Sequence, residues 1–272
     1  MSRIDQLFAD LRRQGRKALM PFVTAGDPDT DFTADVIREL DRRGASMCEI
    51  GIPYSDPIAD GPVIQASYTR ALAKKVSVQQ IFGMLEGLRG SVKMPLVTMV
   101  SYAIVYRYGL ARYVADAQQA GVAGAIVPDL LVEEAGELAA LCKAADFSLI
   151  QLVTPTTPRE RAVQIARSSS GFLYYVSVTG ITGERTELPP SLGDNVRWLR
   201  TQTDLPICIG FGISRPEHVK LLAPVADGLI VGSAIVRRVA EAAQHPRADV
   251  LQGVGEYAAS LLTALHGTGE AS

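Results

Sequence analysis

The segment ADGLIVGSAIV, residues 226 to 236, contains the unit from which the fold can be inferred. Its run Gly228–Val231 is apolar without alternation, which is typical of a strand that is buried on both faces of a parallel sheet. Gly232 and Ser233 follow this run, and Ser233 is a residue type that favours the start of a helix. The segment therefore predicts a buried strand, a tight turn and a short helix in direct succession.

The same unit recurs along the chain. Seven more apolar runs come before this one, and a segment with helical periodicity follows each of them. We expect these strands at Ala18–Thr24, Met47–Ile50, Pro95–Val100, Gly124–Val127, Ser148–Val153, Phe172–Val176 and Pro206–Gly210. Eight strands that alternate with helices predict an α/β fold, a (β/α)₈ TIM barrel that spans residues 1–272 as a single domain.

An open, doubly wound sheet is the structural alternative. It is disfavoured because no glycine-rich dinucleotide turn follows the first predicted strand and no linker divides the chain. Ile4, Leu7, Phe8 and Leu11 follow helical spacing, so we expect an extra N-terminal helix packed under the barrel. A further helix is expected from Thr30 to about Arg43, closed by Gly44.

Composition excludes several classes of function. The net charge is −2 and the pI about 6.0, so the chain has no basic field that could hold a nucleic-acid backbone. No apolar stretch approaches the roughly 18 residues that span a bilayer, and the N-terminus lacks the apolar core of a signal peptide. The three cysteines are far apart and show no metal-ligand spacing. We therefore expect a cytoplasmic protein without a metal site.

Glu49 is the residue most indicative of chemistry. It interrupts an apolar run near the carboxyl end of the second predicted strand, the end at which barrel enzymes place their active sites. Burial would raise the pKa of this carboxyl group towards neutrality, as a residue that both gives and takes a proton requires. The alternative is a glutamate that faces the helices and pairs with an arginine.

Asp60 lies in the loop that follows, within the stretch SDPIADGP. Pro57 and Pro62 stiffen this loop, and Gly61 permits an unusual backbone turn, so the loop could hold a carboxylate over the barrel mouth. Capping of a turn is the alternative role for this aspartate. The three histidines are His218, His245 and His266, and all lie away from the predicted strand ends. Acid–base chemistry is therefore left to carboxylates or tyrosines.

Glycines follow three consecutive predicted strands, at Gly180 and Gly183, at Gly210 and Gly212, and at Gly232. Their backbone amides, with Ser233 at a helix start, predict an anion site that needs no Lys or Arg. Four apolar or aromatic residues near strand ends could line a pocket for an aromatic ligand, although each alone is more typical of plain core: Phe22, Ile64, Tyr102 and Tyr174.

Six segments resemble one family, the tryptophan synthase α subunit: PFVTAGDP from Pro21, EIGIPYSDPIADGP from Glu49, YGLARYVADAQQAGVAGAIVPDL from Tyr108, SVTGITG from Ser177, GFGIS from Gly210 and ADGLIVGSAIV from Ala226. The resemblance runs along essentially the whole chain. It implies a barrel that cleaves indole-3-glycerol phosphate to indole and glyceraldehyde 3-phosphate. It also implies an α₂β₂ complex, in which a pyridoxal-phosphate β subunit joins indole to serine, and no cofactor in this chain.

The resemblance also implies a role for individual residues. Glu49 and Asp60 match the two catalytic carboxylates, and Thr182 matches a loop residue that closes over Asp60. The implied phosphate contacts are Gly183, Gly212, Gly232 and Ser233. The implied indole pocket consists of Phe22, Ile64, Tyr102 and Tyr174.

The chain departs from the family pattern at two places. Ala103-Ile104 stands where an Asn-Pro pair is common, and Leu131 stands where proline is usual. Both places face the β subunit in the family. These departures concern binding of the β subunit rather than the chemistry. Three alternatives are open besides the α subunit: a stand-alone indole-glycerol-phosphate lyase, a catalytically silent activating subunit, and a sugar-phosphate isomerase or epimerase on a related barrel.

Overall fold

A computed structural model describes residues 1–58, 60–177, 190–210 and 212–267 of the chain. These residues form nine strands, and every neighbouring pair is parallel. The strands are β1 (Ala18–Thr24), β2 (Cys48–Gly51), β3 (Leu96–Met99), β4 (Val122–Ile126), β5 (Ser148–Ile150), β6 (Leu152–Val153), β7 (Leu173–Val176), β8 (Ile207–Gly210) and β9 (Gly228–Val231). Their order is β5-β4-β3-β2-β1-β9-β8-β7-β6.

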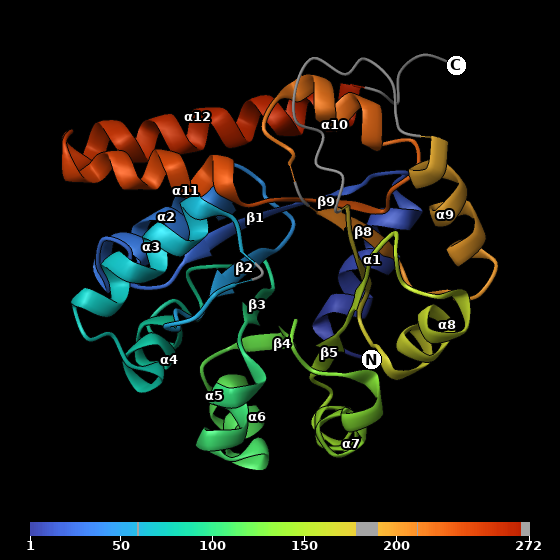
Figure 1. The fold of residues 1–272 in the computed structure, drawn as a ribbon. Helices are drawn as coiled ribbons and strands as arrows, with labels where there is room; N and C mark the ends of the chain where they lie inside the picture. Colours follow the sequence, from blue (N-terminus) through green and yellow to red (C-terminus); the bar gives the residue numbers. More distant parts are fainter. Residues whose placement is uncertain (59, 178–189, 211, 268–272) are drawn as a thin grey trace.

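The two ends of this order are consecutive pieces of chain. β5 pairs with β4, β6 pairs with β7, and Gln151 alone separates β5 from β6. The Gln151 carbonyl accepts a hydrogen bond from the Tyr174 backbone N–H at 3.1 Å. The predicted strand Ser148–Val153 is thus two short strands rather than one, and through them the sheet closes into the predicted barrel (Figure 1). The other predicted strand bounds differ from the observed ones by at most two residues.

Helices surround the barrel (Figure 1). They are α1 (Arg3–Arg13), α2 (Thr30–Arg42), α3 (Pro62–Ala73), α4 (Val78–Glu86), α5 (Tyr102–Tyr108), α6 (Leu110–Gln119), α7 (Gly136–Ala144), α8 (Arg159–Ser168), α9 (Pro190–Arg200), α10 (Pro216–Leu222), α11 (Ser233–Ala240) and α12 (Arg247–His266), with 3₁₀ turns η1 (Val132–Glu134) and η2 (Glu241–Ala243). Gly44, with φ of 91°, follows the end of α2 as expected. Within the described ranges, no helix is both long and apolar enough to cross a membrane.

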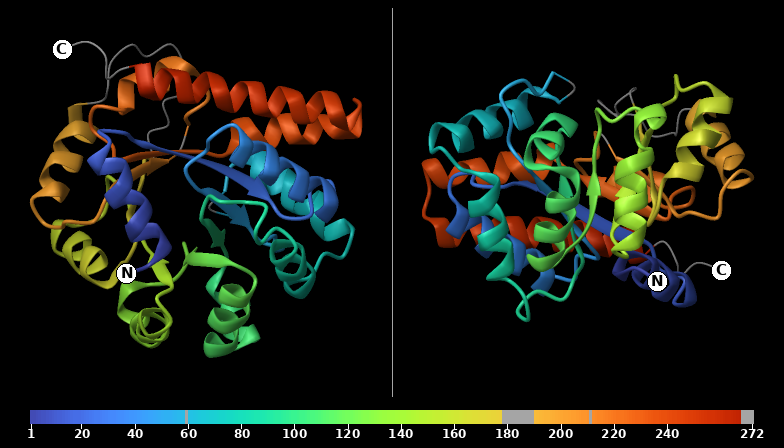
Figure 2. Two further views of the ribbon diagram at one scale, coloured as in Figure 1. Left: turned by 180° about the vertical axis from the view of Figure 1, so that it is seen from behind. Right: turned by 90° about the horizontal axis from the view of Figure 1, so that it is seen from below.

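The predicted N-terminal helix is confirmed as α1. A capping box between Ser2 and Asp5 fixes its start. Ile4, Phe8 and Leu11 are buried in one cluster with the side chains that fill the barrel interior, and the Phe8 and Phe172 rings lie 5.9 Å apart. The left view of Figure 2, which is seen from behind relative to Figure 1, shows α1 lying over one end of the barrel. The amino-terminal end of the barrel is therefore closed by apolar packing.

Side chains along β2 alternate between two environments, as a strand requires. Cys48 and Ile50 pack in the cluster between the barrel and the helices, whereas Met47 just before the strand packs in the barrel interior. Glu49 therefore turns to the interior, one pleat nearer the carboxyl end than Met47. A separate apolar cluster of Phe22, Ile64, Tyr68 and Val236 lies at that end.

Candidate active site

The carboxyl ends of the strands surround a cavity of about 350 Å³, within the size range of small-molecule sites. Its lining includes Phe22, Glu49, Asp60, Ile64, Met99, Tyr174, Gly212, Ile213, Ser214, Gly232, Ser233 and Arg237. The cavity thus brings together eight of the residues that the sequence predicts to form the site, contributed by segments that are far apart in the chain.

Glu49 is the most deeply buried polar group of this cavity. It is paired in the sheet with Phe22 of β1 and Val97 of β3, and 1% of its surface is exposed. Neither carboxyl oxygen has a hydrogen-bond partner among the described residues. Burial without a compensating partner raises the pKa of Glu49 to about 8. The alternative of a helix-facing glutamate paired with an arginine is wrong.

Two glycines at strand ends make room for the aromatic walls. A Cβ atom at Gly51 would lie 2.3 Å from Cζ of Phe22 and 3.0 Å from the Tyr68 hydroxyl. A Cβ atom at Gly210 would lie 2.3 Å from the Tyr174 hydroxyl. Because such contacts are too short for any side chain, glycine is needed at both positions for the rings to pack beside Glu49.

Asp60 lies in the loop after β2. Burial raises the pKa of its carboxyl group, and the nearby Tyr54 hydroxyl opposes the rise. The Gln65 amide donates to the backbone carbonyls of Pro57 and Asp60, at 3.2 and 2.8 Å, and so ties the loop to α3. The Asp60 side chain therefore lines the cavity, as predicted.

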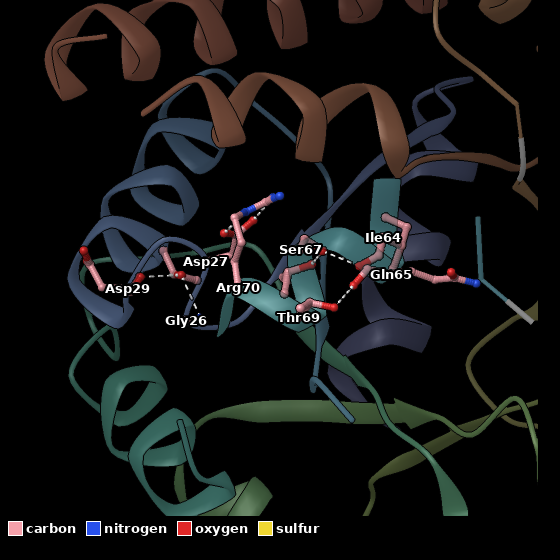
Figure 3. Close-up of polar contacts among 10 residues, drawn as sticks. Gly26, Asp27, Asp29, Ile64, Gln65, Ser67, Thr69 and Arg70 are labelled. Carbon is pink, nitrogen blue, oxygen red and sulfur yellow. Dashed lines mark hydrogen bonds and ion pairs between the residues drawn. The ribbon is translucent and has the colours of Figure 1, made fainter. Parts of the chain in front are cut away.

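The helix that carries Ile64 is fixed to the end of β1 (Figure 3). Arg70 of α3 forms a two-pronged ion pair with the buried Asp27 at 2.8 and 2.7 Å. One turn earlier, the Ser67 hydroxyl lies 2.6 Å from that of Thr24 and donates to the Ile64 carbonyl at 2.7 Å. These contacts hold the wall formed by α3 against the strand that carries Phe22.

The opposite end of the cavity suits an anion. Gly232 ends the turn after β9, and α11 begins at Ser233 with no side chain capping its first N–H groups. A helix N-terminus of this kind favours negative charge. Gly212 lies beside it with φ of 79°, a left-handed conformation that glycine adopts without strain. The other predicted contacts on this side, Gly183 and Thr182, lie outside the described residues.

Arg237 also lines the cavity, and the sequence analysis missed it. It lies four residues after Ser233 on α11, so both residues share one face of the helix. No carboxylate in the described residues forms an ion pair with it. The neighbouring Arg238 instead stacks over the Tyr257 ring at 3.6 Å and donates to the Ala234 carbonyl. The spacing from Ser233 is the signal by which Arg237 could have been found.

Tyr102 is not part of the cavity lining. Its backbone N–H donates to Asp129 at 2.7 Å, and its ring packs 6.0 Å from that of Tyr106. Its role as an indole contact therefore stays a prediction. Met99, at the end of β3, does line the cavity and contributes an apolar wall that the sequence analysis did not identify.

The arrangement has a clear chemical polarity. The lining combines apolar and aromatic side chains, a buried carboxyl group whose pKa is raised to about 8, a second carboxyl group, and a helix N-terminus with an arginine. No cluster of three or more His, Cys, Asp or Glu side chains suited to a metal ion occurs in the described ranges. The cavity can thus bind a molecule with a flat apolar part and an anionic part, and its buried carboxyl group can exchange a proton with that molecule.

Comparison with known proteins gives a consistent result. The family model described as "Tryptophan synthase alpha chain" matches residues 8–262. A relative of that name from Rhodopirellula baltica is 62% identical over 252 residues, which cover 92% of this chain and 91% of the relative. The crystal structure of the tryptophan synthase alpha chain from Legionella pneumophila has a TM-score of 0.89 at 33% identity, with full coverage of both chains. A structure of tryptophan synthase from M. tuberculosis in an aminoacrylate-bound form has a TM-score of 0.86 at 27% identity and covers 97% of this chain and all of that one.

Proposed function

The chain belongs to the tryptophan synthase alpha chain family, and on that premise we propose how its cavity carries out the α reaction. It is a lyase of tryptophan biosynthesis. The finer proposal is that it cleaves the carbon–carbon bond of indole-3-glycerol phosphate and releases indole and glyceraldehyde 3-phosphate. The observation that carries it is a buried Glu49 without a hydrogen-bond partner among the described residues, in a cavity that is also lined by aromatic side chains and by an uncapped helix start.

The polarity of the cavity supports one orientation of the substrate. Phe22, Ile64 and Tyr174 offer apolar surface to the indole ring, at the end where the two carboxyl groups lie. Gly212, Gly232 and Ser233 offer backbone N–H groups to the phosphate. Tyr102, Gly183 and Thr182 belong to the same proposal through the family resemblance alone. Arg237 adds positive charge to the phosphate end.

Glu49 is proposed as both acid and base. Its carboxylic acid gives a proton to indole C3, which produces a cationic indolenine. The resulting carboxylate then takes the proton of the glycerol hydroxyl next to the ring. The bond between C3 and that carbon breaks, its electron pair returns to the ring to form neutral indole, and the hydroxyl carbon becomes the aldehyde of glyceraldehyde 3-phosphate. Glu49 ends the cycle protonated, ready for the next substrate.

Asp60 is proposed to stabilise the charge that develops at the indole nitrogen. Its carboxylate accepts a hydrogen bond from the ring N–H, and this bond strengthens as the ring becomes cationic. The nearby Tyr54 hydroxyl favours the ionised form of Asp60. Neither step requires a cofactor in this chain. The family resemblance implies pyridoxal phosphate in the β partner.

We place that partner on the face that carries the cavity. Three large apolar side chains are exposed there, on the segments that follow β2, β3 and β4: Ile58, Tyr106 and Leu131. Exposed apolar surface on this face supports a protein partner there. The family resemblance adds the α₂β₂ assembly, its place in the cytoplasm and the passage of indole to the partner. A silent activating subunit would not need a buried Glu49 kept without a hydrogen bond, because such a group destabilises the fold.

Product analysis tests the reaction. The purified chain, incubated with indole-3-glycerol phosphate, should release indole and glyceraldehyde 3-phosphate in equal amounts. A sugar-phosphate isomerase or epimerase on a related barrel would convert a sugar phosphate and leave indole-3-glycerol phosphate intact. Unchanged indole-3-glycerol phosphate together with turnover of a sugar phosphate would refute the proposal.

A further inference from the structure

His218 is a buried side chain near the anion end of the cavity, although it does not itself line the cavity. It lies in α10 with 3% of its surface exposed. Its Nδ1 atom accepts a hydrogen bond from the backbone N–H of Ser214 at 3.3 Å. Ser214 lines the cavity together with Gly212 and Ile213. The imidazole therefore contacts, from behind, the segment that faces the ligand.

The protonation state of the ring agrees with this contact. Burial, and next the charge of Arg215, lower the pKa of His218, while the Gly212 backbone and Glu217 oppose the change. The ring is thus neutral near pH 7, and Nδ1 can accept a hydrogen bond only when the proton is on Nε2. Nε2 is buried without a hydrogen-bond partner among the described residues.

A buried N–H group without a partner is unfavourable, and an apolar side chain of similar size would avoid that cost. The hydrogen bond that Nδ1 accepts therefore explains why a histidine occupies this position. Nδ1 satisfies the Ser214 amide and holds the carboxyl end of a segment that begins at Gly212. Because glycine is free to adopt many backbone conformations, a segment that starts with it loses much entropy when a ligand orders it, unless another contact has already fixed it.

On the basis of the function proposed above, we infer that His218 is a positioning residue for the phosphate of the substrate. By accepting the Ser214 N–H, it fixes the segment Gly212–Ser214 in the conformation that leaves the Gly212 amide facing the phosphate. We expect His218 to affect phosphate binding rather than the proton transfer, because Glu49 and the aromatic walls lie on other elements of the barrel.

Two substitutions separate this role from plain packing. His218→Leu keeps the volume and removes the acceptor, whereas His218→Asn places an amide oxygen close to the position of Nδ1. Each variant of the full chain, together with the β subunit, is assayed for kcat and KM with indole-3-glycerol phosphate and for the Kd of sn-glycerol 3-phosphate. Thermal unfolding checks that each variant is folded, and His218→Ala serves as the acceptor-free variant should leucine prevent folding.

We expect the acceptor-free variant to raise both KM and the Kd of sn-glycerol 3-phosphate about three- to tenfold, the range that one lost hydrogen bond corresponds to. Its kcat should stay within about twofold, and His218→Asn should restore both constants. Wild-type binding by the acceptor-free variant would overturn the inference, as would an asparagine variant that binds as weakly as leucine. The Kd comparison does not depend on turnover, so a wild-type chain that fails to cleave the substrate refutes the proposed reaction and leaves this test in place.

Discussion

Glu49 and Asp60 line the same cavity, but only Asp60 has a neighbouring described side chain, Tyr54, whose hydroxyl lowers the pKa of its carboxyl group; both oxygens of Glu49 are buried without a described hydrogen-bond partner. The Tyr54 hydroxyl favours the ionised carboxylate of Asp60, whereas burial without a donor favours the neutral acid at Glu49. Two carboxyl groups with different environments can take different roles in one reaction. This difference is the basis for assigning proton transfer to Glu49 and charge stabilisation to Asp60.

Glu49→Gln should abolish indole release, with a fall in kcat of at least about 10²- to 10⁴-fold, because glutamine cannot transfer a proton. The variant keeps the shape of the side chain, so the Kd of sn-glycerol 3-phosphate and the circular dichroism spectrum should match those of the wild type. Near-normal turnover by this variant would show that another group supplies the proton.

The rate should fall in alkaline solution. Glu49 must be protonated to give a proton to indole C3, and burial raises its pKa to about 8. The reactive form therefore predominates below that pH and declines about tenfold with each further pH unit above it. We expect kcat/KM for indole-3-glycerol phosphate to follow this decline while the chain remains folded by circular dichroism. A kcat/KM that stays constant well above pH 8 would argue against Glu49 as the acid.

Asp60→Asn should lower kcat by about 10²-fold, because a neutral amide stabilises a cationic indolenine less than a carboxylate does. Asp56 provides a matched control in the same loop, since it is exposed and accepts a hydrogen bond from the Ser55 hydroxyl at 2.5 Å. Asp56→Asn should leave the activity of the isolated chain unchanged. Equal losses in the two variants would indicate a general effect on the loop rather than a role for the Asp60 charge.

Arg237→Gln should raise KM for indole-3-glycerol phosphate about three- to tenfold at low salt, and the difference should shrink as salt screens the charge. In the reverse condensation, KM for glyceraldehyde 3-phosphate should rise in the same way, while KM for uncharged indole should not. Arg238→Gln removes the same charge from the same helix but acts at the Tyr257 ring, so its KM values should remain normal. Identical KM changes in both variants would contradict a local contact with the phosphate.

The repeating unit of apolar run and helix was sufficient to predict the barrel, because parallel strands buried on both faces have a recognisable sequence pattern. The division of one predicted strand at Gln151 could not be predicted. It depends on which neighbour each half of the strand pairs with, and apolar composition carries no information about pairing. The single-domain organisation over residues 1–272 stays a prediction.

Glu49 could be identified from sequence because a carboxylate in an apolar run is costly unless it has a function. The contributions of Tyr54 and His218 could not, since each depends on a contact that only the folded chain brings together. Arg237 could have been found from its four-residue spacing from Ser233 on one helix. The sequence does not single out His218, because it lies in a predicted helical segment and not at a strand end. In the folded chain its ring nevertheless contacts the segment after β8, because Nδ1 accepts a hydrogen bond from the N–H of Ser214, four residues earlier.

The central claim is that this chain is the α subunit of a tryptophan synthase, and titration with the β subunit tests it most directly. The rate of indole release from indole-3-glycerol phosphate is measured for a fixed amount of the chain as a tryptophan synthase β subunit is added. Glu49→Gln at each point serves as the blank. We predict slow release by the chain alone and a rate that rises and saturates near one β subunit per chain. A brisk rate that β does not change would make it an independent lyase, and no release at any ratio would contradict the account.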